Sequence, residues 1–86
     1  MLDTLSCLER FAAATRSHAD LSLLNVSLGD PAYVRVRNRF SDNLAETVTC
    51  SPDGGFITSW GYRLGTADDI EAAAARLAYL LAALPA

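Results

Sequence analysis

The segment LAETVTCSPDGGFITSW, residues 44–60, carries a hairpin turn between two runs of strand-forming residues. Its proline presets the first central position of a type I turn, and Gly54 accepts the left-handed conformation that closes a three-residue loop. Such a loop pairs Ser51 with Gly55, whereas a two-residue loop would slip the pairing by one residue and turn Trp60 outward. The three-residue loop predicts these cross-strand pairs: Cys50 with Phe56, Val48 with Thr58, Glu46 with Trp60, and Leu44 with Tyr62.

The three-residue loop is favoured because its register gathers bulky side chains on one apolar face of one long final strand. That face would hold Phe56, Trp60, Tyr62 and Leu64. Gly65 would end the strand, and Thr66 would cap a helix that carries Asp69 at the capping-box position. The apolar stripe of this helix comprises Ile70, Ala73, Ala74, Leu77, Leu80, Leu81 and Leu84, and Pro85 ends it.

Three further elements are expected before the hairpin. Residues 2–17 have apolar residues at helical spacing, with Asp3 or Thr4 as N-cap. Residues 21–28 form a strand that the turn at 29–31 ends, and AYVRVRNRF, residues 32–40, is the clearest strand, followed by a turn at 41–43. The sequence therefore predicts a single α+β domain over residues 1–86: a helix, a four-stranded antiparallel meander and a second helix. Both helices would pack on one face of the sheet and leave the other face open.

The composition disfavours several functional classes. The formal net charge is −3 and the sequence pI is about 4.8, which disfavours binding to nucleic acid or to an acidic membrane surface. No apolar run approaches the roughly 20 residues of a membrane helix, and the amino terminus has no secretory signal pattern. Cys7, Cys50 and the single His18 do not make a zinc set. We therefore expect a reduced cytoplasmic protein with no metal and no cofactor.

One predicted strand face is strongly basic in this acidic chain. Val34 and Val36 point one way, and the residues that point the other way are Tyr33, Arg35, Arg37 and Arg39, with Arg63 as a further candidate. Arginine forks suit carboxylates and phosphates, so this row predicts a surface for an acidic protein partner or an anion. The alternative is a solvated sheet face whose long side chains cover neighbouring threonines.

Glu46 stands out among the acids because the predicted register sets it on the apolar face, opposite Trp60. A buried carboxylate costs several kcal/mol unless it is paired. Glu46 therefore either reaches an arginine or the rim of the sheet, with rim placement and a salt bridge favoured, or serves as an acid of raised pKa beside Trp60 and Tyr62. No histidine, serine or second acid at useful spacing supports catalysis. These three residues form an alternative site, for a small molecule or an anion.

The carboxy-terminal half combines several short motifs: Glu46-Thr47-Val48-Thr49, Pro52-Asp53, Ser59-Trp60-Gly61, Asp68-Asp69 and Arg76. In these motifs the chain resembles a set of small uncharacterised actinobacterial proteins, over roughly residues 33–84. The aromatic strand of that family usually holds more tryptophans than FITSW does. The resemblance implies a bacterial cytoplasmic origin and a regulatory or accessory role, and it carries no known activity and no known catalytic residues.

These observations predict a non-catalytic interaction or regulatory module that binds an acidic protein partner through Tyr33 and the arginine row. A thin core and exposed sheet edges favour a homodimer as well. The alternative is a small-molecule or anion binder that uses Glu46, Trp60 and Tyr62. An enzyme ranks third, because the sequence shows neither a nucleophile–base pair nor a metal set. The remaining candidates, Cys7, Cys50 and His18, are expected to be structural, with His18 capping helix carbonyls.

Overall fold

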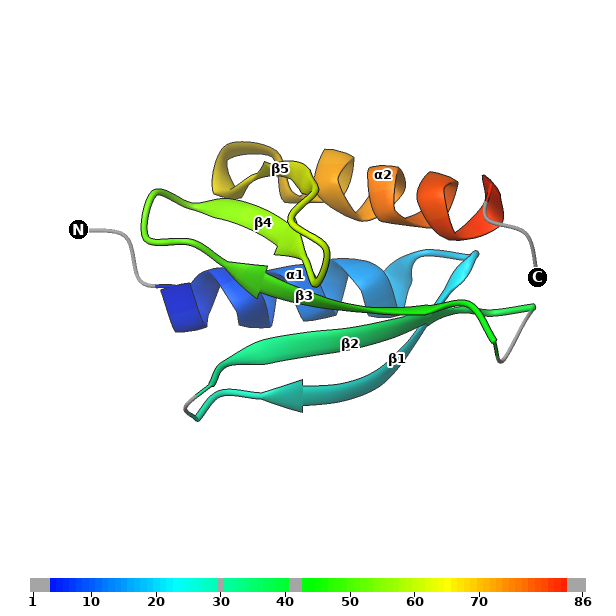
Figure 1. Ribbon diagram of the computed structural model, residues 1–86, viewed down its shortest axis with the longest axis horizontal. Coiled ribbons are helices and arrows are strands. Elements are labelled where there is room, and N and C mark those ends of the chain that lie inside the picture. Colours follow the sequence, from blue (N-terminus) through cyan, green and yellow to red (C-terminus); the bar gives the residue numbers. More distant parts are fainter. Residues whose placement is uncertain (1–3, 30, 41–42, 84–86) are drawn as a thin grey trace.

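The computed structural model describes residues 4–29, 31–40 and 43–83, which form two helices and one antiparallel sheet (Figure 1). The elements are α1 (Thr4–Ser17), β1 (Leu21–Ser27), β2 (Tyr33–Asn38), β3 (Ala45–Cys50), β4 (Gly55–Thr58), β5 (Arg63–Thr66), a 3₁₀ turn (Ala67–Asp69) and α2 (Ile70–Ala83). The strands lie in chain order, β1-β2-β3-β4-β5, and each pairs antiparallel with its neighbours. The α+β class and the antiparallel meander are confirmed, but the sheet has five strands where four were predicted.

The hairpin between β3 and β4 has the predicted register. Gly54 has φ +90°, and its N–H donates to the carbonyl oxygen of Ser51 at 2.9 Å. The N–H of Ser51 in turn donates to the carbonyl oxygen of Gly55 at 2.8 Å, which closes the three-residue loop. The pairs Val48↔Thr58 and Cys50↔Phe56 follow from this loop.

The predicted long final strand is wrong, because the chain turns again directly after Thr58. Gly61 has φ +86°, a left-handed conformation that a pleated strand does not use, and its N–H donates to the carbonyl oxygen of Thr58 at 3.0 Å. Thr58 also donates its N–H to the carbonyl oxygen of Tyr62 at 2.9 Å, and its Oγ1 accepts the N–H of Tyr62 at 3.0 Å. These bonds close a tight turn over residues 59–61, and the chain returns as β5 along the far side of β4.

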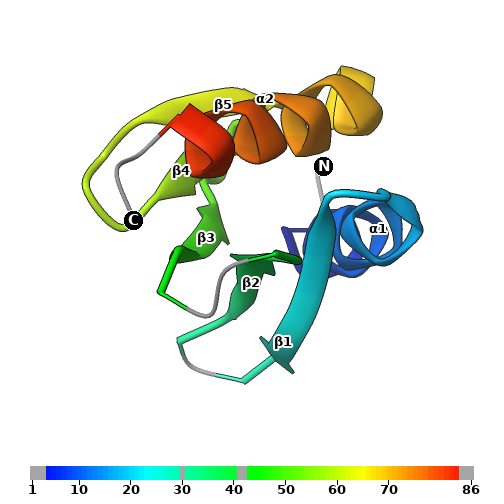
Figure 2. The same ribbon diagram turned by 90° about the vertical axis from the view of Figure 1, so that its right-hand side faces the viewer.

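Both helices pack on the same face of the sheet, as predicted. Figure 2 shows the sheet curving around them, with α1 beside β1 and α2 beside β5. Phe11 of α1 stacks on Phe56 of β4, with ring centroids 4.7 Å apart. The fully buried side chains come from both helices and from four of the strands: Leu8, Phe11, Thr15, Leu21, Val34, Val36, Val48, Phe56, Leu77 and Leu81.

The start of α2 differs from the predicted capping box. Thr66 makes no side-chain capping bond, whereas Oδ1 of Asp69 accepts the N–H of Ala72 at 3.1 Å. Asp69 is therefore the N-cap of α2, because the 3₁₀ turn moves the helix start three residues along the chain. Gly65 makes the close approach of β5 to α2 possible, since a Cβ atom there would lie 3.1 Å from Cβ of Ala73.

Several predicted features fall outside the described residues. They are Leu2 and Asp3 in the first helix, Asp30 in the first turn, Ser41 and Asp42 in the second turn, and Leu84 and Pro85 at the end of the last helix. The predicted strand over residues 32–40 is two residues shorter at its end, because β2 stops at Asn38.

Candidate interaction surface

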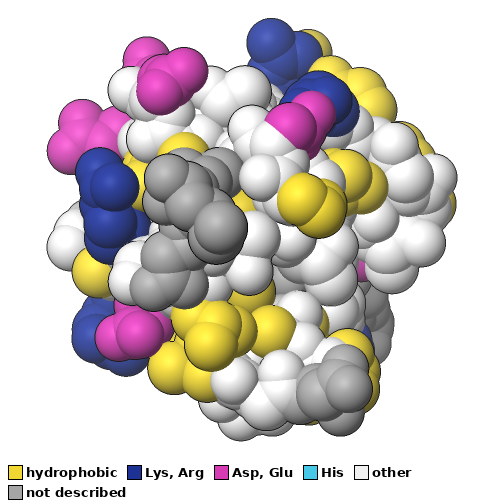
Figure 3. Space-filling model, turned by 90° about the vertical axis from the view of Figure 1, so that its left-hand side faces the viewer, with side chains coloured by type: hydrophobic (Ala, Val, Ile, Leu, Met, Phe, Trp, Pro, Cys, Tyr) yellow, Lys and Arg dark blue, Asp and Glu magenta, His cyan; other side chains and the backbone are white. Residues whose placement is uncertain are grey.

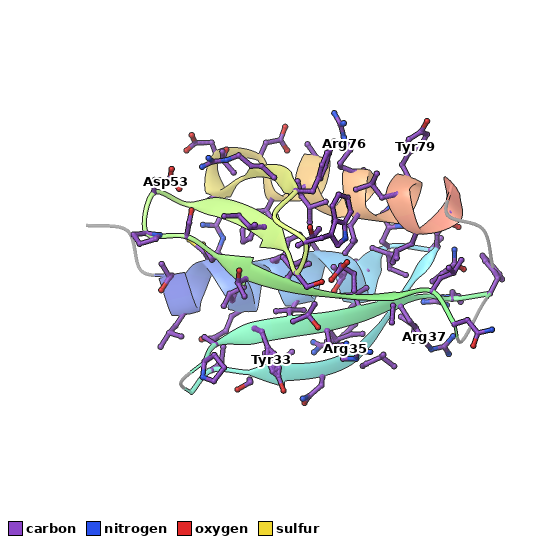
Figure 4. All side chains as sticks on the ribbon, in the orientation of Figure 1. Tyr33, Arg35, Arg37, Asp53, Arg76 and Tyr79 are labelled. Atoms are coloured by element: carbon purple, nitrogen blue, oxygen red, sulfur yellow. The ribbon has the colours of Figure 1, made fainter. Side chains whose placement is uncertain are left out.

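The alternation along β2 separates a buried side from a basic side. Val34 and Val36 are completely buried against the helices. Figure 4 shows Tyr33, Arg35 and Arg37 in succession along β2, on the side of the molecule away from α2. The predicted opposite orientation of the valines and these three residues therefore holds.

Cross-strand partners lie on the same face of a sheet. The partners of these side chains are mostly polar, so the open sheet face is polar around them. Arg35 pairs with Asn25 on one side and Thr47 on the other, and its Nη1 donates to Oγ1 of Thr47 at 3.0 Å. The hydroxyl of Tyr33 accepts a hydrogen bond from Nδ2 of Asn25 at 3.2 Å. Nη1 of Arg37 donates to the carbonyl oxygen of Asn38 at 3.0 Å. These bonds orient the side chains along the surface.

Two of the predicted basic residues leave this row. Arg39 follows the end of β2, and its Nη2 donates to the carbonyl oxygen of Leu21 at 3.0 Å, which brings the guanidinium to the start of β1. Arg63 lies on β5, three strands from β2, and forms an ion pair of 2.8 Å with Asp53. The basic surface on the sheet therefore centres on Tyr33, Arg35 and Arg37, which we call the β2 row.

Carboxylates are absent from the part of the sheet face that β1, β2 and β3 provide in the described residues. The residues of β1 and β3 that pair with the β2 row, and so share its face, are Ser22, Asn25, Ser27, Ala45 and Thr47. Glu46, the acid of β3, pairs with Val36 and so belongs to the helix side of the sheet. Figure 3 shows a different pattern at the end of the molecule that carries the β3–β4 turn, where basic and acidic side chains lie close together.

Glu46 has a structural task that the sequence analysis did not foresee. Its Oε1 accepts the N–H of Thr47 at 2.8 Å, the N–H of Ser59 at 3.2 Å and the hydroxyl of Ser59 at 2.5 Å, and its Oε2 accepts Nε1–H of Trp60 at 2.5 Å. Burial alone would raise the pKa of Glu46, but these hydrogen bonds together lower it by more than burial raises it. The net shift of the pKa is therefore downward. Glu46 lies at the rim of the sheet, as one alternative predicted, but its partners among the described residues include no arginine. The other alternative, an acid of raised pKa, is wrong.

Trp60 lies on the surface, which corrects its prediction as a core residue. Its side chain is 57% exposed because it sits in the turn after β4 and not on a strand. The indole lies beside the half-buried Tyr62, with ring centroids 5.2 Å apart at an interplanar angle of 34°. Glu46 and Trp60 are neighbours, as predicted, but they meet through a hydrogen bond at the rim of the sheet.

The aromatic pair continues onto α2 through residues that the sequence analysis did not single out as a site. Nη1 of Arg76 donates to the hydroxyl of Tyr62 at 3.0 Å, and Tyr79, one helical turn further, is 69% exposed. Figure 4 shows Arg76 and Tyr79 projecting from α2, on the side opposite the β2 row. Their i, i+3 spacing outside the apolar stripe was the available signal.

The cysteines and the histidine lie within the packed structure. Cys7 is buried, and Cys50 is half-buried against the same core. Burial, together with the neighbouring Cys7, raises the pKa of the Cys50 thiol to about 11. Nδ1 of His18 accepts the N–H of Asp20 at 3.1 Å, so the ring closes the turn after α1. The predicted bond from this ring to a helix carbonyl is not present among the described residues. Among the described residues, no three His, Cys, Asp or Glu side chains gather into a metal-binding group.

Two surface grooves lie beside α1 and β1. One has a volume of about 500 Å³ and lies between α1 and the start of α2, with Arg10, His18 and Glu71 among its lining residues. The other has a volume of about 510 Å³ and follows β1, between Arg16 and Arg39. Neither groove includes a residue of the predicted alternative site, Glu46, Trp60 and Tyr62.

The comparisons with known proteins give no relative: no protein-family model, no curated protein and no solved structure matches the chain. Within the described residues, neither helix has the length and apolar character needed to cross a membrane.

Proposed function

We propose that this protein is a non-catalytic interaction module that binds an acidic protein partner through the β2 row. The observation that carries the proposal is the charge of the open sheet face: Arg35 is exposed there and has no carboxylate partner among the described residues. Carboxylates of a partner would supply the hydrogen-bond acceptors that the guanidinium fork suits best.

The geometry of the face favours recognition by a folded or extended protein surface. The hydroxyl of Thr47 holds one nitrogen of Arg35, and the remaining guanidinium donors are available to a partner. Tyr33 lies on the same strand and offers a flat ring beside the charge, and both residue types are enriched at the energetic centres of interfaces. With a formal net charge of −3, the protein would repel nucleic acid outside this patch.

A second copy of the chain is one source of such acids. Asp68, Asp69 and Glu71 are exposed around the start of α2 and carry like charge, so α2 of one copy would complement the β2 row of another. The resemblance to small actinobacterial proteins supports a cytoplasmic setting and a regulatory or accessory role. Mass measurement across micromolar concentrations tests the homodimer, and a strict monomer removes it.

The experiment compares partner capture by three immobilised proteins: wild type, the double variant Arg35→Gln/Arg37→Gln, and Arg10→Gln as a matched control on α1. We expect the double variant to lose the captured protein and the control to retain it, with both variants keeping the circular dichroism of the wild type. Capture should weaken as salt rises, because exposed charge pairs are screened. If the double variant captures the same protein equally well, the β2 row is not the binding surface.

The rigid aromatic pair supports a second candidate, binding of a small molecule or anion beside Trp60. Glu46 holds the indole through Nε1–H and leaves a ring face exposed, so the ligand would meet Trp60, Tyr62 and Arg76, with Glu46 as their support. Trp60 is the single tryptophan of the chain. Titrating its fluorescence with small anions and metabolites tests this candidate, and a flat response across the panel argues against it.

A further inference from the structure

β1 forms one edge of the sheet, and its outer side is free of any other strand in the described residues (Figure 2). The N–H of Asn38 donates to the carbonyl oxygen of Leu44, so Asn38 directs its backbone groups toward β3. Val36, two residues earlier on β2, has the same orientation. Leu23 pairs with Val36 across an antiparallel ladder, and its own N–H and C=O must therefore point away from β2. Leu23 thus offers a backbone donor and acceptor to a further strand, whereas the N–H and C=O of Leu21 are already bonded to His18 and Arg39.

A bulge gives this edge an exposed apolar side chain. The pairing with β2 shifts between Leu23 and Asn25, which leaves Leu24 without a cross-strand partner. Leu24 is 47% exposed, and bulges are known to redirect a side chain in this way. The groove of about 510 Å³ runs along the same strand and includes Leu24 in its lining. The edge therefore combines a backbone ladder with a hydrophobic contact.

The positive charge of the groove along β1 favours an acidic occupant. Its lining residues are Arg16, Leu21, Ser22, Leu23, Leu24, Asn25, Val26 and Arg39, which include two arginines and no acid. The bond from Arg39 to the carbonyl oxygen of Leu21 fixes one guanidinium at the start of the strand. Arg16 has no hydrogen-bond or ion-pair partner for its side chain among the described residues. An occupant that places carboxylates near these two positions would gain charge-assisted hydrogen bonds.

We propose that β1 binds an extended acidic peptide segment, which adds to the sheet as a sixth strand. The peptide backbone pairs with the outward groups of β1, an apolar side chain contacts Leu24, and acidic side chains reach Arg16 and Arg39. Pairing of two β1 edges from two copies would bring these arginines no carboxylate from the facing groove, because the lining of each copy holds none. This inference is independent of the β2 row, because neither Arg35 nor Arg37 lines the groove.

The test uses fluorescein-labelled peptides and the whole protein. The probe is an acetylated, amidated peptide of sequence Glu-Val-Glu-Val-Glu-Val-Glu, and the comparison peptide has lysine in place of each glutamate. Two further versions of the acidic probe carry N-methyl groups on alternate residues, one set on the valines and one on the glutamates. An added strand turns only alternate N–H groups toward its neighbour, so one methylated version should lose binding and the other should keep it.

We expect the acidic probe to bind at least about tenfold more tightly than the lysine peptide, measured by fluorescence polarisation. Arg16→Gln should weaken binding, whereas Arg10→Gln and Arg35→Gln/Arg37→Gln should leave it unchanged. Amide signals of Leu23, Leu24 and Val26 should shift in NMR spectra. The proposal is overturned if both methylated peptides bind alike, if the acidic probe does not bind, or if Leu24→Glu abolishes a dimer of the free protein that occupies this edge.

Discussion

The two turns of the β3–β4–β5 region share one design and differ in where its parts come from. Each places a glycine in the left-handed conformation, Gly54 at φ +90° and Gly61 at φ +86°, and each is held by a carboxylate. Asp53 belongs to the first turn itself, and its Oδ1 accepts the N–H of Gly55 at 3.1 Å and the hydroxyl of Ser51. Glu46 holds the second turn from 13 residues earlier in the chain. We call Asp53 the local clamp and Glu46 the remote clamp. The residues of the first turn specify its conformation by themselves, whereas the second turn forms only when the sheet brings Glu46 to it.

Replacing Glu46, the remote clamp, is expected to cause the largest loss in the free energy of unfolding. Glu46→Ala removes four hydrogen bonds, and we expect the free energy of unfolding to fall by about 1–2 kcal/mol, because the bonds are charged but partly solvated. Urea denaturation measures the loss. The fluorescence of Trp60 should shift as its Nε1–H bond is lost, and Glu46→Gln should show a smaller change in both quantities. An unchanged midpoint in Glu46→Ala would show that the turn holds itself.

Substitution of Gly61 is expected to cause the next largest loss in the free energy of unfolding. No atom lies within 4 Å of a Cβ atom built on Gly61, so Gly61→Ala reports backbone strain alone. We expect the free energy of unfolding to fall by about 1 kcal/mol for this variant, the cost of holding an alanine in the left-handed conformation. Gly29→Ala is the control, since its added Cβ also meets nothing and its φ lies outside the left-handed region. A neutral Gly61→Ala would contradict the turn over residues 59–61.

Acid should remove the stabilisation that the Asp53 carboxylate gives to the first turn, over a defined pH range. Hydrogen bonding to Ser51 and the bonds to Arg63 and Gly55 lower the pKa of Asp53 from 3.8 to about 2. Because the folded-state pKa is the lower one, the stabilisation is complete above pH 3.8 and is lost as the pH falls toward about 2. Asp53→Asn should flatten this part of the stability curve by a small amount, since the group is exposed. Equal acid sensitivity in the variant and the wild type would assign the effect to other carboxyls.

The smallest expected effect is on the alkylation rate of Cys50. This residue directly precedes the first turn, so its reactivity reports whether the turn stays closed. Burial and Cys7 raise its pKa to about 11, so the thiolate is scarce at neutral pH and alkylation by iodoacetamide should be slow. The rate should rise steadily up to about pH 11. Gly54→Ala should speed alkylation at pH 8 if the turn opens, and Gly61→Ala should not. Rapid modification of the folded wild type at neutral pH would contradict the described packing.

The contrast between the two turns explains which parts of the fold the sequence could predict. Proline, Asp53 and Gly54 are adjacent and specify the first hairpin by local conformation alone. Gly61 carried the only local sign of the second turn, because a glycine inside a strand pattern often marks a bend. The strong alternation around Trp60 and Tyr62 favoured a continuous strand, and the contribution of Glu46 became visible only through its contacts.

The candidate site divides in the same way. The period of two along β2 sufficed to set Tyr33, Arg35 and Arg37 on the side opposite Val34 and Val36. The end of a strand depends on its neighbours, and the N–H of Arg39 donates to the carbonyl oxygen of Asp20 beyond the last residue of β2. The bulge at Leu24 and the groove along β1 likewise arise from pairing between strands, which no pattern within a single strand records.

The meander also has a consequence for the order of folding. Every strand pairs with its neighbour in the chain, so each hairpin closes a short loop at low entropic cost. The stacking of Phe11 on Phe56 joins positions separated by more than half of the chain. We expect the hairpins to form early and the docking of α1 to be the slow, late step, so that truncating Phe11 would mainly accelerate unfolding.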